Sequence, residues 1–300
     1  MSHLEIKFNV SDNGIAYEEL LEKITYLTSE LIKNNKVLDF SLSQSFKTFF
    51  LVYTGAYDMR ILKRFFSSFQ GLYATFSPLS DCSEISKAYA IGEINANTVK
   101  REFLSKRAYL IALASTFKNN YLELNPNVFS ILPIIEESLP NSKYVLLTFD
   151  GRRAVQNAMN NHFYTVKDPN DRITALDFPK DPYFNKWHEM SDFERVCWWW
   201  QKEDSILNAN YKNDNKHIAL KYEDLFDRKH YGTHIRKLCQ FLELPAMNKV
   251  LKIWDKRLAK NDNQKSMGDF PHWKDWTDEQ KEQFERIAGE HMREIGYSLK

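Results

Sequence analysis

The sequence predicts an α/β fold in three layers, a mostly parallel β-sheet flanked by helices on both faces. Apolar segments of strand length alternate with segments of helical periodicity through most of the chain, which is typical of parallel sheets. The composition, 43% hydrophobic and 14% aromatic, supplies enough apolar side chains for a large core. Residues 141–161 read as a buried strand, a tight polar turn and a helix, a layout that places a ligand site at the strand's carboxyl end.

The first part of the chain predicts a helical extension and then strand–helix units. Residues 1–45 form the extension, in which apolar residues recur at helical spacing at Leu20, Leu21, Ile24, Leu27, Leu31 and Ile32. A strand over 48–53 leads through a turn into a helix over 60–69. A helix over 99–117 then precedes a short strand over 121–124.

The middle of the chain contains the most informative strand and a long irregular segment. A helix over 127–138 is stopped by Pro140, just before the strand over 143–148. The irregular segment, 163–190, contains three prolines, and a loop of this length in a compact domain predicts a substrate lid.

The last third predicts three helices and one strand, which complete a single domain of 300 residues. Ser191, with Glu194 three residues later, forms a capping box that opens a helix over 191–210. A strand follows over 217–222, then a helix over 235–241 and a terminal helix over 278–295.

The charge and cysteine content exclude several classes of partner. The 41 basic and 40 acidic residues give a net charge of +1, which argues against nucleic acid, although a local basic patch remains compatible with it. Cys82, Cys197 and Cys239 lie far apart without metal-ligand spacing, so we expect buried, reduced thiols and no metal. We find no signal peptide and no run long enough to span a bilayer, and therefore expect a cytoplasmic protein without a membrane partner.

A series of motifs, in order and spacing, is similar to bacterial sulfotransferases. In chain order they are Tyr-Leu-Glu-Leu-Asn-Pro-Asn at 121–127, the strand and turn at 139–152, Cys-Trp-Trp-Trp at 197–200, Ala-Leu-Lys-Tyr-Glu-Asp-Leu-Phe at 219–226, Leu-Cys-Gln-Phe-Leu-Glu-Leu-Pro at 238–245, Phe-Pro-His-Trp-Lys-Asp-Trp at 270–276 and Met-Arg-Glu-Ile-Gly-Tyr at 292–297. The resemblance spans roughly residues 46–297. It implies the P-loop-like sulfotransferase fold, with 3′-phosphoadenosine 5′-phosphosulfate (PAPS) as cofactor. It also implies sulfuryl transfer to a hydroxyl or amine of a small molecule, by in-line chemistry like phosphoryl transfer.

By this resemblance, the first donor loop follows the first strand. It comprises Tyr53, Thr54, Gly55, Ala56, Tyr57, Asp58, Met59, Arg60, Ile61 and Leu62. We expect Thr54, Gly55 and Arg60 to contact the donor and Tyr57 to contact the substrate. Ala56 occupies the position of the family's cation, and Asp58 falls within the position of its Ser-Gly-Thr-Thr run. A carboxylate facing a phosphate is repulsive in a partly dry site, so this loop predicts weakened donor binding.

The second donor loop also departs from the family's pattern in a way that weakens donor binding. Phe149 and Asn157 correspond to the family's Arg and Ser that hold the 3′-phosphate. Asn157 can still donate a hydrogen bond, but Phe149 cannot replace an Arg contact of about 1.5–3 kcal/mol, and we assign Phe149 to the substrate. Arg152 matches the family's pattern, and Lys265 lies in a loose counterpart of its late basic loop, so both are expected donor ligands.

The predicted catalytic residues are Glu123, Asp150 and His162. Glu123 lies between Leu122 and Leu124, so its side chain points to the opposite face of the strand from those two apolar side chains. It is either a general base or half of a structural ion pair. Asp150 is either a catalytic carboxylate or the partner of Arg152 in a stiffened turn. His162 is either a site residue or a solvated surface histidine.

Further substrate contacts are assigned to Asn125, Trp187 and His188. Asn125 follows Glu123 at the same strand end, and His188 lies beside Trp187 in the predicted lid. The Trp198–Trp200 cluster could stack on a ring, but core packing is the favoured interpretation of a helical aromatic stripe.

Three functions remain open from the sequence. The favoured one is an enzyme acting on a small molecule, with the PAPS site eroded or rebuilt so that the reaction is no longer sulfuryl transfer. The reason is that Ala56, Asp58 and Phe149 all lower the affinity for an anionic donor. The second is an active PAPS-dependent sulfotransferase that takes its cations from Arg60, Arg152, Arg153 or Lys265. The third is a non-catalytic binding protein. The acceptor and the oligomeric state are not predicted.

Overall fold

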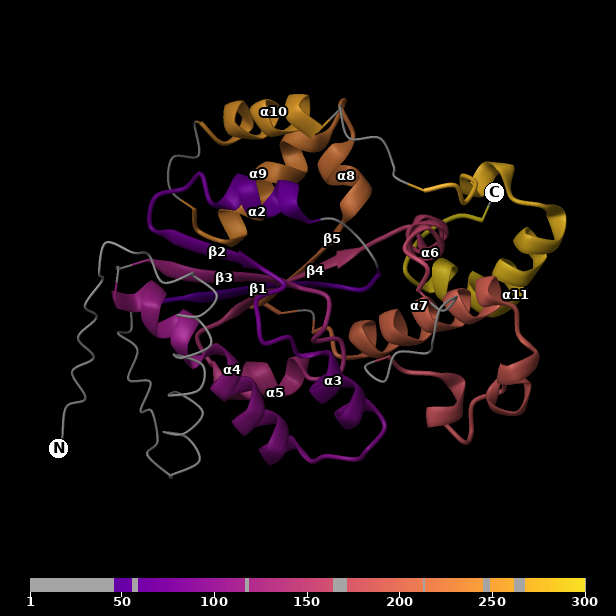
Figure 1. Cartoon of the computed structure of the whole chain (residues 1–300). Helices are drawn as coiled ribbons and strands as arrows, with labels where there is room; N and C mark the ends of the chain where they lie inside the picture. Colours follow the sequence, from indigo (N-terminus) through magenta and orange to yellow (C-terminus); the bar gives the residue numbers. More distant parts are fainter. Residues whose placement is uncertain are drawn as a thin grey trace, which may run out of the picture.

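A computed structural model describes residues 46–55, 59–116, 119–163, 172–212, 214–244, 249–261 and 268–299 (Figure 1). The helical extension expected within residues 1–45 lies outside the described residues. Tyr57 and Lys265, with Ala56 and Asp58, also lie outside them.

The described chain contains one parallel sheet with the strand order β2-β3-β1-β4-β5. The strands are β1 (Thr48–Tyr53), β2 (Leu72–Phe76), β3 (Asn120–Asn125), β4 (Lys143–Thr148) and β5 (His217–Lys221). Phe50 of β1 lies opposite Glu123 of β3 on one side and Tyr144 of β4 on the other. The predicted α/β class with helices on both faces is confirmed.

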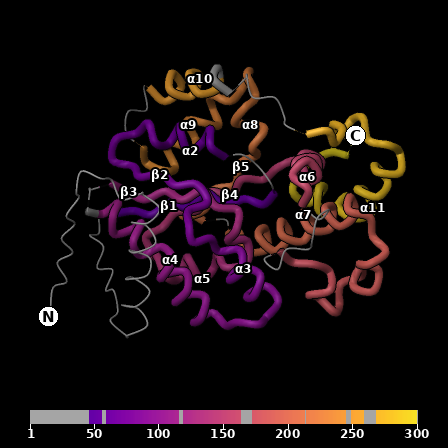
Figure 2. The backbone as a smooth tube through the Cα atoms, viewed as in Figure 1, coloured from indigo at the N-terminus to yellow at the C-terminus, as the bar shows by residue number. Residues whose placement is uncertain are grey.

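Helices cover both faces of the sheet (Figures 1 and 2). One face carries α2 (Arg60–Phe66), α8 (Tyr222–Phe226), α9 (Tyr231–Phe241) and α10 (Val250–Asn261). The other face carries α3 (Ser83–Ala90), α4 (Ala96–Thr116) and α5 (Leu132–Ser138).

A third group of helices lies beside the carboxyl end of β4, which leads directly into the first of them (Figure 1). The group consists of α6 (Gly151–Asn160), α7 (Asp192–Ala209) and α11 (Asp278–Glu294). The predicted capping box is present: the backbone N–H of Ser191 donates to Glu194 Oε2 at 2.9 Å, and the backbone N–H of Glu194 donates to Ser191 Oγ at 3.3 Å.

Two apolar cores separate at the sheet, because successive side chains of a strand point to opposite faces. Phe50 and Val52 of β1 enter the core shared with α4 to α7 and α11, whereas Phe49 and Leu51 enter the core under α2, α9 and α10. All three cysteines are buried, as expected, and none of them forms a disulfide. No described helix is both long and apolar enough to cross a membrane.

Several predicted boundaries are wrong. Helix α2 ends at Phe66 and not at 69, α4 begins at Ala96 and not at 99, and α9 begins at Tyr231 and not at 235. The helix predicted over 127–138 begins only at Leu132, because Pro133 lacks an N–H and is tolerated only in a first turn. The strand predicted to end at Tyr222 ends at Lys221, and Tyr222 begins α8. The predicted lid contains two 3₁₀ helices, Ala175–Asp177 and Phe184–Glu189.

Candidate functional site

The turn after β1 is described at Thr54, Gly55 and Met59. Thr54 is fully buried, and Gly55 has φ +99°, a left-handed conformation that favours glycine. Arg60 opens α2 with an exposed side chain. Positions 56–58 lie outside the described residues, so the expectation for Tyr57 stays a prediction.

Phe149, at the end of β4, packs inside the protein. Only 1% of its surface is exposed. Its ring stacks on Tyr222, with centroids 4.6 Å apart, and meets Tyr53 at 5.8 Å. The ring therefore belongs to the core under α2, α9 and α10.

Asp150 and Arg152 hold one another at the start of α6. Asp150 is the N-cap: its Oδ1 accepts from the backbone N–H and the Nε of Arg152 at 3.0 and 2.9 Å, and its Oδ2 accepts from Nη2 at 2.7 Å. The Arg152 guanidinium also lies 3.9 Å from the ring centroid of Trp273. Its Nη1 is buried and has no hydrogen-bond partner among the described residues. The pairing matches the stiffened turn that the sequence left open.

Glu123 is fully buried in an ion pair with Arg107. Arg107 Nε donates to both carboxylate oxygens at 2.9 and 2.8 Å, while Tyr121 Oη donates at 2.7 Å and Asn125 Nδ2 at 2.6 Å. Burial, the largest single influence, would lower the pKa of Arg107, but the charge and hydrogen bond of Glu123 together with the charges of Cys82 and Tyr121 outweigh it and raise that pKa above its usual value. Asn125 is also engaged at its oxygen, which accepts from the backbone N–H of Asn127 at 2.8 Å. Both side chains are thus occupied by protein partners, which favours the structural alternative for Glu123.

The predicted histidines do not meet these carboxylates. His162 is exposed beyond the C-terminal end of α6, a ten-residue helix that separates it from Asp150 by about 15 Å along the axis. His188 is exposed in the second 3₁₀ helix, and its neighbour Trp187 is fully buried against Trp198, with ring centroids 5.3 Å apart.

Asn157 and the segment after Lys265 lie along α6. Asn157 is half-buried, and its backbone oxygen accepts from Asn161 Nδ2 at 2.7 Å. Asn160 Oδ1 accepts from the backbone N–H of Phe270 at 2.8 Å, which attaches the segment after position 267 to this helix.

A buried chain of hydrogen bonds that we did not predict links β1 to α7 and α11. Thr54 Oγ1 donates to Asp204 Oδ1 at 2.5 Å. Asp204 Oδ2 lies 2.7 Å from His291 Nε2 and accepts from Asn208 Nδ2 at 2.7 Å. The available signal was two adjacent carboxylates, Glu203 and Asp204, which follow the Trp198–Trp200 cluster on the same helix.

His291 completes this chain on the other side of its ring. Its Nδ1 lies 3.2 Å from Ser205 Oγ and 3.4 Å from Glu294 Oε2. Burial would lower the pKa of His291, but the hydrogen bond and the charge of Asp204, with a smaller contribution from Glu294, outweigh it and raise the pKa above the ordinary value.

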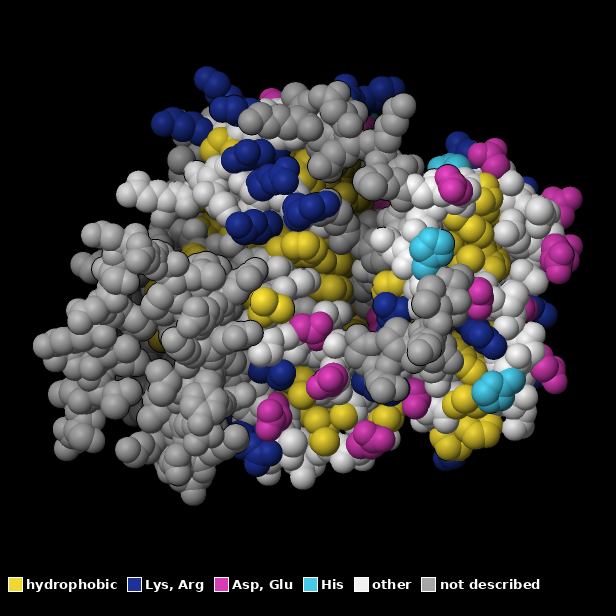
Figure 3. Space-filling view, viewed as in Figure 1, with side chains coloured by type: hydrophobic (Ala, Val, Ile, Leu, Met, Phe, Trp, Pro, Cys, Tyr) yellow, Lys and Arg dark blue, Asp and Glu magenta, His cyan; other side chains and the backbone are white. Residues whose placement is uncertain are grey.

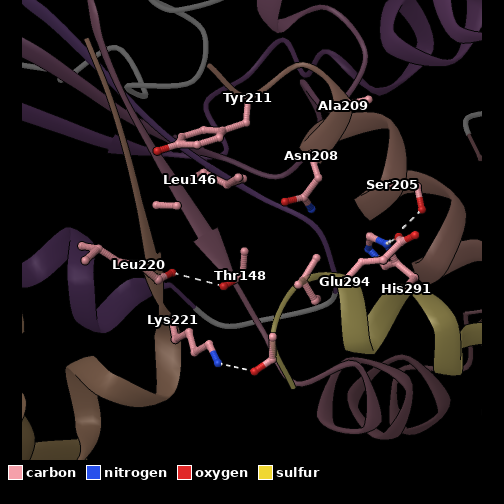
Figure 4. Close-up of a pocket in the computed structure, with 13 residues that line it drawn as sticks. Leu146, Thr148, Ser205, Asn208, Ala209, Tyr211, Leu220, Lys221, His291 and Glu294 are labelled. Atoms are coloured by element: carbon pink, nitrogen blue, oxygen red, sulfur yellow. Dashed lines mark hydrogen bonds and ion pairs between the residues drawn. The ribbon is translucent and has the colours of Figure 1, made fainter. Parts of the chain in front are cut away.

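His291 borders a cavity of about 670 Å³ between strands β4 and β5 and the C-terminal ends of α7 and α11 (Figure 4). The polar lining consists of Thr148, Ser205, Asn208, Tyr211, Lys221, His291 and Glu294. The apolar lining includes Leu146, Ala209, Ala219, Leu220 and Ile295. Figure 4 shows His291 and Glu294 on α11, across the cavity from Leu146 and Leu220 on the strands. The volume is in the range of small-molecule sites.

Comparison with known proteins gives the fold. No family model matches the sequence, and no curated protein sequence matches it either. Among solved structures, sulfotransferase STF9 from Mycobacterium avium aligns with TM-score 0.58 and 9% identity, over 94% of this chain and 86% of that chain. The chain therefore has a sulfotransferase-like α/β fold.

Two further sulfotransferases align less closely. Mouse sulfotransferase SULT7A1, complexed with PAP, has TM-score 0.46 and 16% identity, over 82% of this chain and 85% of that chain. The sulfotransferase from Alicyclobacillus acidocaldarius has TM-score 0.46 and 10% identity, over 83% of this chain and 96% of that chain. At such identities the likeness concerns the fold alone.

Proposed function

We propose that this chain is an enzyme that acts on a small molecule and carries a rebuilt donor site in a sulfotransferase-like fold. The observation that carries the proposal is the placement of His291 in the cavity wall: its Nε2 lies against the buried Asp204 carboxylate, and its Nδ1 lies against Ser205 and Glu294, which also line the cavity. In this proposal the His291–Asp204 pair takes the acid–base role that the sequence assigned to Glu123, Asp150 and His162.

The side chains of the turn between β4 and α6 support the proposal that the donor site is rebuilt. Phe149 occupies the position of the family's phosphate-binding Arg and is enclosed by aromatic rings. A charged side chain at this position would be buried and would lose its hydration, which is unfavourable. Asp150 places its own carboxylate at the start of α6 and takes three hydrogen bonds from Arg152. The backbone N–H of Gly151 is directed to Met292 Sδ at 3.2 Å. These groups serve the fold and offer little to a bisphosphorylated nucleotide.

The geometry of His291 fits general acid–base catalysis. In the tautomer that we assign from the hydrogen bond, Nε2 donates to the Asp204 carboxylate. Nδ1 lies against Ser205 Oγ and Glu294 Oε2, two side chains of the cavity wall, so a substrate group would take the place of one of these contacts. A hydroxyl or amine of a substrate in the cavity would exchange its proton with Nδ1. Asp204, only 1% exposed, would fix the ring and stabilise its charged form. The substrate class is therefore a small molecule with an ionisable or nucleophilic O–H or N–H.

PAPS-dependent sulfuryl transfer is the second candidate, and two observations favour it. Gly55 has the positive φ of a loop that can approach a phosphate closely, and Arg152 Nη1 is buried without a partner among the described residues. In that case Arg60, Arg152, Asn157 and Lys265 would hold the donor. A non-catalytic binding protein would keep the cavity but show no turnover.

Metabolite conversion tests the proposal. The purified chain is incubated with a small-molecule extract of the producing cell, and consumption is followed by mass spectrometry. We expect the wild type and His230→Gln, a control at an exposed histidine with no assigned role, to deplete the same compound, and His291→Gln to lose this activity while keeping its fold. Turnover by His291→Gln at the wild-type rate would exclude the proposed role of His291. Binding without turnover in all three proteins would favour the binding protein.

A further inference from the structure

Helix α10 has one apolar face and one basic face. Val250 and Trp254 are fully buried, and Trp254 Nε1 donates to the backbone oxygen of Leu225 at 3.1 Å. On the other side, Lys249, Lys252 and Lys256 recur at spacings of three and four residues and so share one side of the helix. Figure 3 shows Lys and Arg side chains gathered over α2 and α10. The molecule thus concentrates positive charge here, although its net charge is only +1.

A pocket of about 470 Å³ lies on this basic face. It is lined by Ser68, Lys249, Lys252, Ile253, Lys256 and Arg257. Within the part of the chain that the structure describes, this lining contains four basic side chains and no acidic one. Arg257 Nη2 donates to Ser68 Oγ at 2.8 Å, which ties α10 to the segment after α2.

The basic side chains of this pocket have no carboxylate partner among the described residues. Asp255, the one acidic residue of α10, accepts a hydrogen bond from Tyr231 Oη instead. Lys63 and Arg64, in the last turn of α2, add two more positive charges to the same side of the sheet. Like charges four residues apart, such as Lys252 and Lys256, destabilise a helix, so this face is stabilised by any anion that binds it.

We propose that this pocket binds a small molecule that carries two or more phosphate groups. Lysine ammonium groups bind phosphate as point charges, and the volume suits a small ligand. No aromatic side chain of the described residues lines the pocket, so this lining offers no stacking surface of the kind with which proteins hold single-stranded nucleic acid. Its concave shape suits a compact anion better than a flat membrane surface.

Calorimetry with sodium tripolyphosphate tests this assignment, without reference to any catalytic activity of the chain. We expect saturable binding by the full chain at low ionic strength, which weakens at about 0.3 M salt because exposed charges are screened. The double substitution Lys252→Gln and Lys256→Gln should weaken binding by about tenfold or more, because it removes two charge-assisted contacts. The melting temperature of the wild type should rise with tripolyphosphate, and that of the double variant should not.

The matched control is the double substitution Lys180→Gln and Lys186→Gln. It changes the net charge equally at two exposed lysines away from α10, and it should bind tripolyphosphate like the wild type. Without the anion, the α10 variant should be at least as stable as the wild type, which separates loss of binding from loss of folding. Equal binding by both variants would overturn the assignment, and so would absence of binding at low salt. Binding to phosphatidylserine vesicles without binding to tripolyphosphate would replace it with a membrane surface.

Discussion

His291 Nε2 lies 2.7 Å from Asp204 Oδ2, in a contact that is almost entirely buried between α7 and α11. The same carboxylate accepts a hydrogen bond from Thr54 at the end of β1. The ring that borders the cavity is thereby connected to the turn that begins at Gly55. The contact between His291 and Asp204 makes the stability of the fold depend on pH.

We predict that His291 stabilises the fold most strongly at acidic pH. Its pKa in the folded protein is raised above the ordinary value of 6.5. The contribution is therefore complete below about 6.5 and is lost as the pH rises through the higher folded pKa. In urea unfolding from about pH 6 to about pH 9, the stability difference between wild type and His291→Gln should shrink with rising pH. His188→Gln, at an exposed histidine, is the control, and a difference independent of pH would contradict the prediction.

Substitution at Glu123 should reduce stability, not act as a selective block of catalysis. Glu123→Gln leaves the Arg107 charge buried without compensation, which should cost about 3–5 kcal/mol in the free energy of unfolding. The double variant Glu123→Leu with Arg107→Met should cost clearly less, because it removes both charges. Chemical denaturation of the three proteins measures this. A stable Glu123→Gln protein that has lost turnover would instead support a catalytic Glu123.

Replacing Phe149 by Arg, the residue that the family carries at the end of this strand, should not restore a phosphate-binding site. Phe149→Arg places a charge in an apolar core between Tyr53 and Tyr222, so we expect an unfolded or aggregated protein, as measured by circular dichroism. Phe149→Leu, which keeps the site apolar, should cost only about 1–2 kcal/mol and leave a cooperative fold. A folded Phe149→Arg protein that gains affinity for a bisphosphorylated nucleotide would contradict this account of the turn.

Gly151→Ala should destabilise α6, although alanine normally favours a helix over glycine by about 1 kcal/mol. A Cβ at this position would lie 2.3 Å from the Trp200 ring, which is fully buried and cannot move aside without repacking. We expect a net loss of about 1–3 kcal/mol and a change in tryptophan fluorescence. Gly232→Ala, where the nearest atom is Leu251 Cδ1 at 3.6 Å, is the control and should be neutral or stabilising.

The sequence was sufficient for the elements whose patterns are local. Strands β1 and β4 have the predicted bounds because each is a short apolar run that ends at a polar turn, and Ser191 with Glu194 marks the start of α7. Strand β2 was not predicted, because it is a five-residue edge strand with two partly exposed positions and no strong pattern.

The candidate site was less predictable, because its partners are distant in sequence. Glu123 looked equally suited to catalysis or to an ion pair, and only the fold shows Arg107 beside it. Asp204 and His291 are 87 positions apart, so no motif could join them. Asp150 and His162 share a strand–turn–helix unit, but the length of α6 separates them.

Calorimetric titration with 3′-phosphoadenosine 5′-phosphate tests the rebuilt donor site most directly. It is best performed on the Lys252→Gln and Lys256→Gln variant, so that the α10 pocket does not contribute binding heat. We expect no binding at millimolar nucleotide, because Phe149 is enclosed in the core and Arg152 is held by Asp150. Saturable micromolar binding by that variant would contradict it and establish a working donor site.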